Sequence, residues 1–415
     1  MPKYVIVGGS AGGIGAVEAI REMDPVGAIT VVSEEPFPHY SRPMIGDFLS
    51  GEATLEKMKY RDDLFWEKNK VHALTGRKAV SLNLTDKYVE LDEEGRIDFE
   101  KLLIATGGKP FVPKIDGVEK DGVFTVTTFS DAECLAAKIE AAKKAVVIGG
   151  GLIGVIVTEA LTKQGVKTTM VELKDRILNL ILDETASEIV EKVIREADVN
   201  IVTGHTVKRI LGKRNNDSVV GGAVLTNGEE VPCDLVIVDI GVIPRTELVV
   251  GTEVKINRGI IVDEFMRTSI PDVYACGDVA EAYDFVWDEN RLLLNWPVAY
   301  LGGRTAGYNM AGKKTEYPGG TAMSALKYFH MPIISVGITN PKEDDGYEVL
   351  ANQDPERNLY KKVVLKNDAV IGMIFMNDIE RTGIIFYLMK NQVNVGSFKK
   401  NFSPKTLDSS LYQNS

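Results

Sequence analysis

Two stretches of the chain share one pattern: a short apolar run, a cluster of glycines and small residues, and then an apolar helical segment. The apolar runs are residues 4–7 and 145–148. Each pattern returns to a second apolar run, residues 28–32 and 168–171, with acidic residues close behind. An apolar run that breaks into glycines and continues as a helix predicts a strand, a turn and a helix. We therefore expect an α/β fold with two βαβ units of the dinucleotide-binding type.

The second glycine cluster has the spacing that a bound dinucleotide requires. Gly149 permits the tight turn, Gly151 lets a pyrophosphate lie against bare backbone, and Gly154 lets the helix pack close to the strand. A plain packing turn is the alternative for any single cluster of this kind. The first cluster favours the nucleotide, because it repeats the spacing with Gly8 at the turn and Gly13 at the packing position.

Ser10 takes the middle position of the first cluster, and serine is small enough that its Cβ need not exclude a phosphate.

Acidic residues follow the second strand of each βαβ unit. Glu172 would accept a hydrogen bond from a ribose 2′-hydroxyl and oppose a 2′-phosphate, which favours NAD over NADP, although Lys174 and Arg176 keep NADP open. We expect Glu34 to meet an adenosine ribose in the first unit, and an ordinary solvated loop acid is the alternative.

Other segments add strand ends and boundaries. Three apolar runs end in small residues that would allow close approach of a cofactor: 101–104 before Ala105-Thr106-Gly107, 234–238 before Gly241, and 271–276 before Gly277 and Asp278. A loop rich in proline and aromatic residues spans 36–43, and a small-residue helix is expected over 302–310. Residues 317–320 mark a boundary, after which residues 360–375 predict a hairpin and residues beyond 404 a mobile end.

Composition narrows the classes of function. At 415 residues the chain is long enough for two or three domains, and its net charge of −11 argues against binding nucleic acid. The three cysteines form no CxxC pair and the four histidines have no metal-ligand spacing, so no metal site is expected. No apolar run is long enough to cross a membrane, and the first strand begins too early for a signal peptide. We therefore expect a cytoplasmic protein.

The motifs, taken in order, resemble the FAD-dependent pyridine-nucleotide oxidoreductases built like glutathione reductase. The resemblance covers residues 1 to about 317 and is closest to the branch of NADH:rubredoxin reductases and NADH oxidases. It implies FAD at the first glycine cluster and NAD(H) at the second, with NADH preferred over NADPH. It also implies two nested Rossmann-like domains plus a C-terminal α+β interface domain similar to that of rubredoxin reductases. The expected boundaries are 1–111 with 246–317 for FAD, 112–245 for NAD(H), and 318–415 for the C-terminal domain.

The resemblance also implies which residues contact each cofactor. Those expected to bind FAD are Gly8, Ser10, Ala11, Gly12, Gly13, Glu34, Ala105, Thr106, Gly107, Gly277 and Asp278. Those expected beside the flavin are Arg42, Pro43, Trp296 and Pro297, with a surface charge and a core aromatic as the alternatives for Arg42 and Trp296. Those expected to bind NAD are Gly149, Gly151, Leu152, Ile153, Gly154, Glu172 and Gly241.

Departures from the family pattern narrow the range of reactions that we expect. The loop at residues 40–43 contains no cysteine, Cys276 lies in an apolar strand and is expected to be inert, and His330 supplies no acid/base element. Ile156 and Asp47 stand where relatives carry a Glu–Lys pair near the flavin. We therefore expect an NADH:acceptor oxidoreductase that reduces a rubredoxin, a ferredoxin or an iron–sulfur subunit, and a homo-oligomer is one assembly open to it. An NADH oxidase and a flavin-containing NADH sensor are the alternatives.

Overall fold

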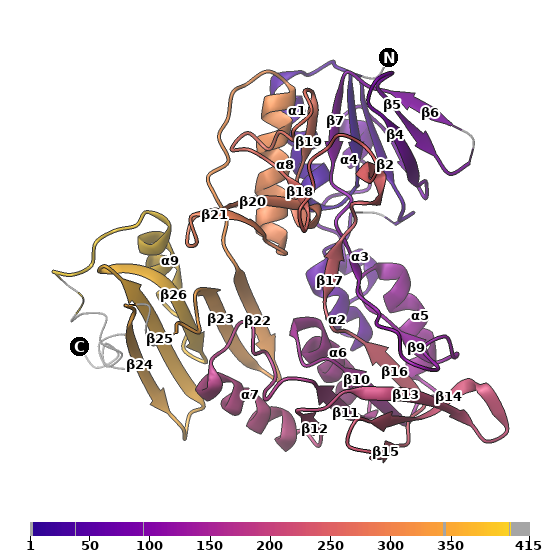
Figure 1. The fold of residues 1–415 in the computed structure, drawn as a ribbon, viewed down its shortest axis with the longest axis vertical. Helices are drawn as coiled ribbons and strands as arrows, with labels where there is room; N and C mark the ends of the chain where they lie inside the picture. The colour runs from indigo at the N-terminus through magenta and orange to yellow at the C-terminus, as the bar shows by residue number, and fades with distance from the viewer. Residues whose placement is uncertain (1–2, 38, 94, 343–345, 398, 400–415) are drawn as a thin grey trace. The chain divides into compact units, whose positions relative to one another are not determined.

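The computed structural model describes residues 3–37, 39–93, 95–342, 346–397 and 399, which form two compact units (Figure 1). The first unit draws on residues 1–44, 54–109 and 242–322, and the second on residues 45–53, 110–241 and 323–415. Each contains a five-stranded parallel sheet with one glycine cluster after its central strand. The expected α/β class with two βαβ units is confirmed.

In the parallel sheet of the first unit, the inner strands are buried on both faces, which explains why they are mostly apolar, whereas one edge strand is partly exposed. Its strand order is β19 (Val273–Ala275), β7 (Lys101–Ile104), β1 (Tyr4–Val7), β2 (Ile29–Ser33) and β3 (Val71–Thr75). All four residues of β1 are buried. Helices α1 (Ala11–Met23) and α8 (Trp296–Met310) pack side by side against it (Figure 1).

Smaller elements complete the first unit. One three-stranded sheet is antiparallel and consists of β4 (Ala79–Asn83), β5 (Tyr88–Leu91) and β6 (Arg96–Asp98). The other is mixed and consists of β18 (Ile260–Ile261), β20 (Ala280–Asp284) and β21 (Glu289–Leu292), with β18 parallel and β21 antiparallel to β20. Short pieces are α3 (Leu55–Met58), α4 (Phe65–Lys68), β8 (Gly108–Pro110) and β17 (Val242–Pro244), with β8 paired to β17. The helix expected over 302–310 begins earlier, at Trp296, because Asn295 caps it and Pro297 fits its first turn.

The parallel sheet of the second unit has the same design. Its strand order is β12 (Asn200–Thr203), β11 (Lys167–Glu172), β10 (Lys144–Ile148), β16 (Leu235–Val238) and β9 (Val123–Phe124). The helices around it are α2 (Ile45–Leu49), α5 (Phe129–Ile139), α6 (Leu152–Lys163) and α7 (Glu184–Glu196). A separate three-stranded sheet consists of β13 (Val207–Lys213), β14 (Asn216–Leu225) and β15 (Glu230–Val231).

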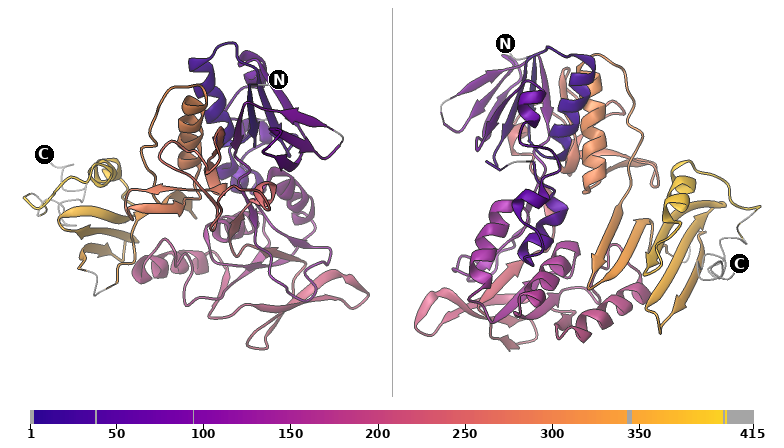
Figure 2. Two further views of the ribbon diagram at one scale, coloured as in Figure 1. Left: turned by 45° about the horizontal axis from the view of Figure 1, so that its top comes forward. Right: turned by 180° about the vertical axis from the view of Figure 1, so that it is seen from behind.

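An antiparallel sheet near the C-terminus belongs to the second unit (Figure 2). Its order is β22 (Met323–Tyr328), β23 (Met331–Gly337), β26 (Ala369–Met376), β25 (Leu359–Lys366) and β24 (Glu348–Asp354), with α9 (Thr382–Lys390) against β26. The expected hairpin is therefore confirmed as β25 and β26, and the end beyond residue 404 lies outside the described residues. This sheet shares an apolar core with α7, in which Ile333 and Ile374 lie with Val190 and Ile194.

Asp183 joins this sheet to α7 through a buried ion pair. Its side chain caps α7 by accepting a hydrogen bond from the Ala186 N–H at 3.0 Å. The same carboxylate accepts hydrogen bonds from the Tyr360 hydroxyl at 2.6 Å and from Lys362 Nζ at 2.7 Å. Only 8% of the Lys362 side chain and 14% of the Asp183 side chain are exposed. One carboxylate thus satisfies three donors from two parts of the second unit.

Replacing Asp183 with Asn tests how much this pair stabilises the second unit. Asn can still cap α7, but it leaves the buried Lys362 charge without a counter-charge, so we expect a loss of about 3–5 kcal/mol in free energy of unfolding. Asp121→Asn is the matched control, because the Asp121–Lys138 pair is exposed on both sides and should contribute about 0–1 kcal/mol. Urea unfolding followed by circular dichroism measures both, and equal losses would contradict the prediction.

Candidate nucleotide-binding sites

The glycine cluster of the first unit lies between β1 and α1. Gly8 has a φ of +123°, and a Cβ on it would lie 2.0 Å from the carbonyl oxygen of Ala105. A Cβ on Gly13 would lie 1.9 Å from the carbonyl oxygen of Gly8, so both positions accept only glycine. Ser10 is the N-cap residue of α1 but makes no side-chain capping bond. The first backbone N–H groups of α1, including that of Gly12, are therefore suited to a phosphate.

The second unit repeats this geometry between β10 and α6. Gly149 has a φ of +110°, and a Cβ on Gly154 would lie 2.1 Å from the Gly149 carbonyl oxygen. Gly151, by contrast, has open space where a Cβ would stand, and its backbone is extended at a φ of −79°. The N-cap residue of α6, Gly151, has no side chain that could cap the helix, whose first turn begins with Leu152 and Ile153. This helix terminus has the features of a pyrophosphate cradle.

Glu172 closes the second site from the end of β11. The side chain is buried, and its two oxygens accept hydrogen bonds from the Gly150 N–H at 2.6 Å and the Lys174 N–H at 2.7 Å. These bonds fix the carboxylate beside the glycine loop, and its remaining lone pairs can accept from a ribose hydroxyl. Gly241 follows β16 with a φ of +124°, and a Cβ on it would meet nothing within 4 Å.

The acidic residues after β2 both have protein partners. Glu34 pairs with Arg245 and, at 3.5 Å, with Lys78. Glu35 accepts a hydrogen bond from the Tyr40 hydroxyl at 2.7 Å and pairs with Arg42. Arg42 is thus an ion-pair residue rather than an isolated surface charge, whereas the choice of Glu34 for the ribose stays a prediction.

Asp278 is the group in the first unit that most clearly fits a bound ligand. None of the described residues donates a hydrogen bond to its carboxylate, and burial raises its pKa to about 6, with Arg42 opposing that rise. Asp278 is only partly exposed, and a carboxylate in such a place without a protein donor is costly unless a ligand supplies one. The hydroxyls of an FAD ribityl chain or ribose are donors of this kind, so the residues present fit FAD. Gly277, at a φ of +74°, allows the turn that precedes Asp278.

The remaining predicted FAD residues lie in the same unit. Thr106 donates its hydroxyl to the Arg245 carbonyl oxygen at 2.8 Å, and Gly107 has open space at a φ of +72°. The Trp296 ring meets the Tyr60 ring edge-on at 5.1 Å between centroids. Pro43 lies in a 3-10 turn with Arg42, and Pro297 and buried Ala11 lie in the first turns of α8 and α1. That Trp296, Pro43 and Pro297 flank a flavin stays a prediction.

The three thiols are poorly placed for redox chemistry. Burial raises the pKa of Cys276 and of Cys233 to about 12, so neither is a thiolate near neutral pH. Cys134 is exposed but lies on α5 in the second unit. Across the described part of the chain, we find no cluster of three potential metal ligands. None of its helices is long and apolar enough to span a membrane.

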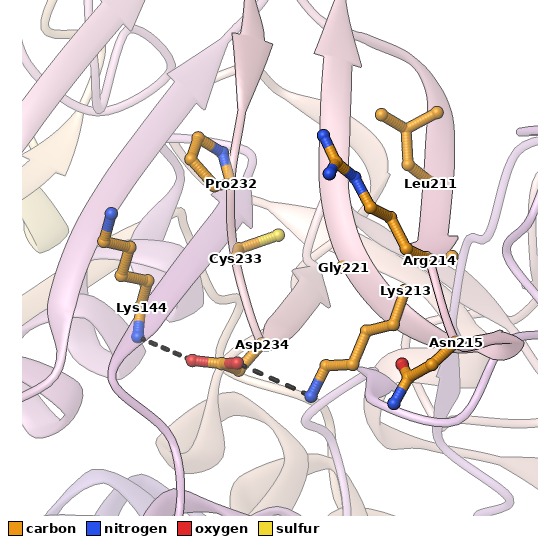
Figure 3. Close-up of a pocket in the computed structure, with 10 residues that line it drawn as sticks. Lys144, Leu211, Lys213, Arg214, Asn215, Gly221, Pro232, Cys233 and Asp234 are labelled. Carbon is orange, nitrogen blue, oxygen red and sulfur yellow. Dashed lines mark hydrogen bonds and ion pairs between the residues drawn. The ribbon is translucent and has the colours of Figure 1, made fainter.

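A cavity of about 430 Å³ in the second unit is a different feature (Figure 3). It is lined by Lys144, Lys213, Arg214, Cys233 and Asp234 among others, and Lys213 Nζ lies 3.7 Å from Asp234. Lys144 begins β10, whereas Gly149 follows the end of that strand. Dinucleotides bind at the carboxyl ends of parallel strands, so this cavity is separate from the predicted NAD site.

One residue beside the second glycine cluster was missed by the motif analysis. Asp239 follows β16, and its carbonyl oxygen would lie 1.7 Å from a Cβ on Gly149. In the sequence it only interrupts an apolar run. Aligning the two βαβ units with each other would have identified it, because it stands where the first unit has Ala105.

Comparison with known proteins agrees with this geometry. Residues 2–303 match the model of the pyridine nucleotide-disulphide oxidoreductase family, and residues 323–393 match the rubredoxin NAD+ reductase C-terminal domain. The chain is 31% identical to the epsilon subunit of an NADH-dependent phenylglyoxylate dehydrogenase from Aromatoleum evansii, over 96% of this chain and 94% of that one. It is 30% identical to a probable ferredoxin reductase of Castellaniella defragrans, over 76% of this chain and 77% of that one.

Among solved structures, NADH:rubredoxin oxidoreductase from Clostridium acetobutylicum has the same fold. The two share a TM-score of 0.78 and 24% identity, with 98% of each chain covered. The order of elements, the paired glycine clusters and the family match agree over most of the chain. The chain therefore belongs to the pyridine nucleotide-disulphide oxidoreductase family and is an FAD-dependent oxidoreductase that uses NADH.

Proposed function

We propose that the chain takes hydride from NADH and passes electrons to a separate redox protein, either a rubredoxin- or ferredoxin-type carrier or the iron–sulfur subunit of a larger enzyme. The observation that carries the proposal is the state of the thiols. The loop around Arg42 contains no cysteine, and the thiol of the first unit, Cys276, is buried and protonated near neutral pH. Electrons that reach a flavin there have no thiol relay, so the acceptor must come from outside.

The first unit would hold and orient FAD. When bound, FAD supplies the exchange between a hydride donor and one-electron acceptors. The N–H groups at the start of α1 would bind the pyrophosphate, and Asp278 would accept hydrogen bonds from sugar or ribityl hydroxyls. Arg42 offsets the negative charge of Glu35 and of Asp278. It would thereby reduce the repulsion between these two carboxylates and an anionic ligand.

The second unit would hold NADH at Gly149, Gly151 and the first turn of α6. Glu172 would select NADH over NADPH, because its fixed and buried carboxylate would face a 2′-phosphate. We infer that the domain boundaries are those expected from the sequence, at residues 111, 245 and 317. Similarity to a dehydrogenase subunit and to a rubredoxin reductase domain supports a protein partner.

Removing all three thiols tests the proposal. We expect Cys134→Ser/Cys233→Ala/Cys276→Ala to retain at least about half of the rate at which NADH reduces a rubredoxin, because no thiol carries electrons. Anaerobic stopped-flow mixing with NADH, then with rubredoxin, separates the two half-reactions. Flavin bleaching without rubredoxin reduction in this variant would show a thiol relay. An oxidase would be favoured instead if the wild-type protein in air consumed NADH as fast as it reduces the carrier and formed a matching amount of peroxide or water.

Gly151→Ala tests the placement of NADH. The backbone at Gly151 is extended and its Cβ would meet nothing within 4 Å, so the protein should fold and retain FAD. The same Cβ would stand where the pyrophosphate approaches the backbone, so we expect the Kd for NAD+ to rise at least about tenfold.

The matched control is Gly383→Ala, which also adds a Cβ into open space, on α9. It should change neither the FAD content nor the Kd for NAD+. An unchanged Kd in Gly151→Ala, with FAD retained, would place the nucleotide elsewhere. Isothermal titration of the oxidised protein with NAD+ measures both variants.

A further inference from the structure

The two units place different residues at one equivalent position. In the first unit β1 pairs with β7, and the next residue, Ala105, closes over Gly8 with its carbonyl oxygen 2.0 Å from where a Cβ would stand. In the second unit β10 pairs with β16 in the same way, and Asp239 closes over Gly149 at 1.7 Å. Asp239 is therefore the counterpart of Ala105, with a carboxylate in place of a methyl group.

The Asp239 carboxylate lies at the helix terminus that would bind the pyrophosphate. It accepts a hydrogen bond from the Gly154 N–H, and a Cβ on Gly154 would lie 3.4 Å from Asp239 Oδ2. A carboxylate is favourable at this terminus as long as no other anion is present, because the helix dipole and the N–H group stabilise it. A dinucleotide brings a second anion to the same few N–H groups.

The charged groups around Asp239 do not offset its charge. Glu172 faces it from β11 with a second carboxylate, and Tyr328 faces it from β22 with a neutral hydroxyl. Within the described ranges, no lysine or arginine forms an ion pair with Asp239. Burial, followed by repulsion from Glu172, raises the pKa of Asp239 to about 6, although the Gly154 hydrogen bond opposes the rise. In the free site Asp239 is thus mostly ionised at neutral pH and becomes protonated about one pH unit below it.

We propose that Asp239 couples nucleotide binding to proton uptake: its carboxyl is ionised in the free site and protonated when the pyrophosphate is bound. This inference rests on the proposed placement of NAD(H) at Gly149–Gly154. The bound pyrophosphate repels the ionised carboxylate, whereas a protonated Asp239 can donate a hydrogen bond to a phosphate oxygen. The residue thereby sets how tightly the site holds NAD(H) at a given pH.

The sign of the pH dependence follows from linkage. Binding favours the protonated form, so the pKa of Asp239 must be higher in the complex than in the free protein. The affinity for the nucleotide is highest and constant below the pKa of Asp239 in the free protein, which is about 6. It then falls by up to about tenfold per pH unit until the pKa of the complex is passed. Between the two pKa values each bound nucleotide takes up as much as one proton.

ADP-ribose is the probe, because it carries the pyrophosphate without the nicotinamide and cannot reduce the flavin. Calorimetric titration of the FAD-loaded protein from about pH 5.5 to about pH 8, in two buffers of different ionisation enthalpy, gives the Kd and the protons taken up. We expect Asp239→Asn to abolish proton uptake, flatten the pH dependence and lower the Kd about tenfold at the upper pH. Asp239→Ala, which reproduces the first unit, should do the same.

Two controls separate Asp239 from other acids. Asp234→Asn removes a carboxylate at the opposite end of β16, beside the cavity in Figure 3, and should leave the wild-type pH dependence intact. Glu172→Gln should weaken binding and move proton uptake to lower pH, because repulsion from Glu172 helps to raise the pKa of Asp239, but proton uptake should persist. Wild-type proton uptake that persists in both Asp239 variants would overturn the inference while leaving the nucleotide site in place. Wild-type protein that binds no ADP-ribose at any pH would overturn the proposed site itself.

Discussion

Both candidate sites depend on a very close backbone approach, at Gly8 in the first unit and at Gly149 in the second. A neighbouring strand brings its carbonyl oxygen within 2.0 Å or less of the place where a Cβ would be. Since no side chain fits, the strand can turn at once into a helix whose first N–H groups point away from the sheet core. The same arrangement occurs twice, so the protein presents two anion-binding helix termini, one in each unit.

The two helix termini differ in whether a basic residue offsets the acidic residues around them. The first unit balances Glu35 and Asp278 with Arg42. In the second unit Glu172 and Asp239 both accept hydrogen bonds from the glycine loop, without a lysine or arginine pairing with Asp239 among the described residues. A tightly held FAD suits the first arrangement and an exchangeable NAD(H) suits the second, because binding to uncompensated acids is weaker and depends on protonation. Cys233 and Cys276 are buried and Cys134 lies on α5 in the second unit, which leaves the flavin as the group suited to carry electrons.

Local patterns made much of this predictable from the sequence. Glycine spacing identified the two βαβ units, and alternating turns and apolar runs identified the hairpin of β25 and β26, because each is determined by residues close in the chain. Distant partners could not be predicted. Arg245 reaches Glu34, and Lys362 reaches Asp183, only after the chain has folded. Asp239 was passed over for another reason: its role is visible only when the two units are compared strand by strand.

The central claim is that FAD is the only redox centre of this chain. Anaerobic titration of the FAD-loaded protein with NADH tests it directly, because each centre takes up its own electrons. The account predicts that one NADH per FAD completes the bleaching of the flavin absorbance and that further NADH is not oxidised. Oxidation of a second NADH per FAD in the absence of any acceptor would reveal a thiol–disulfide centre and contradict the account.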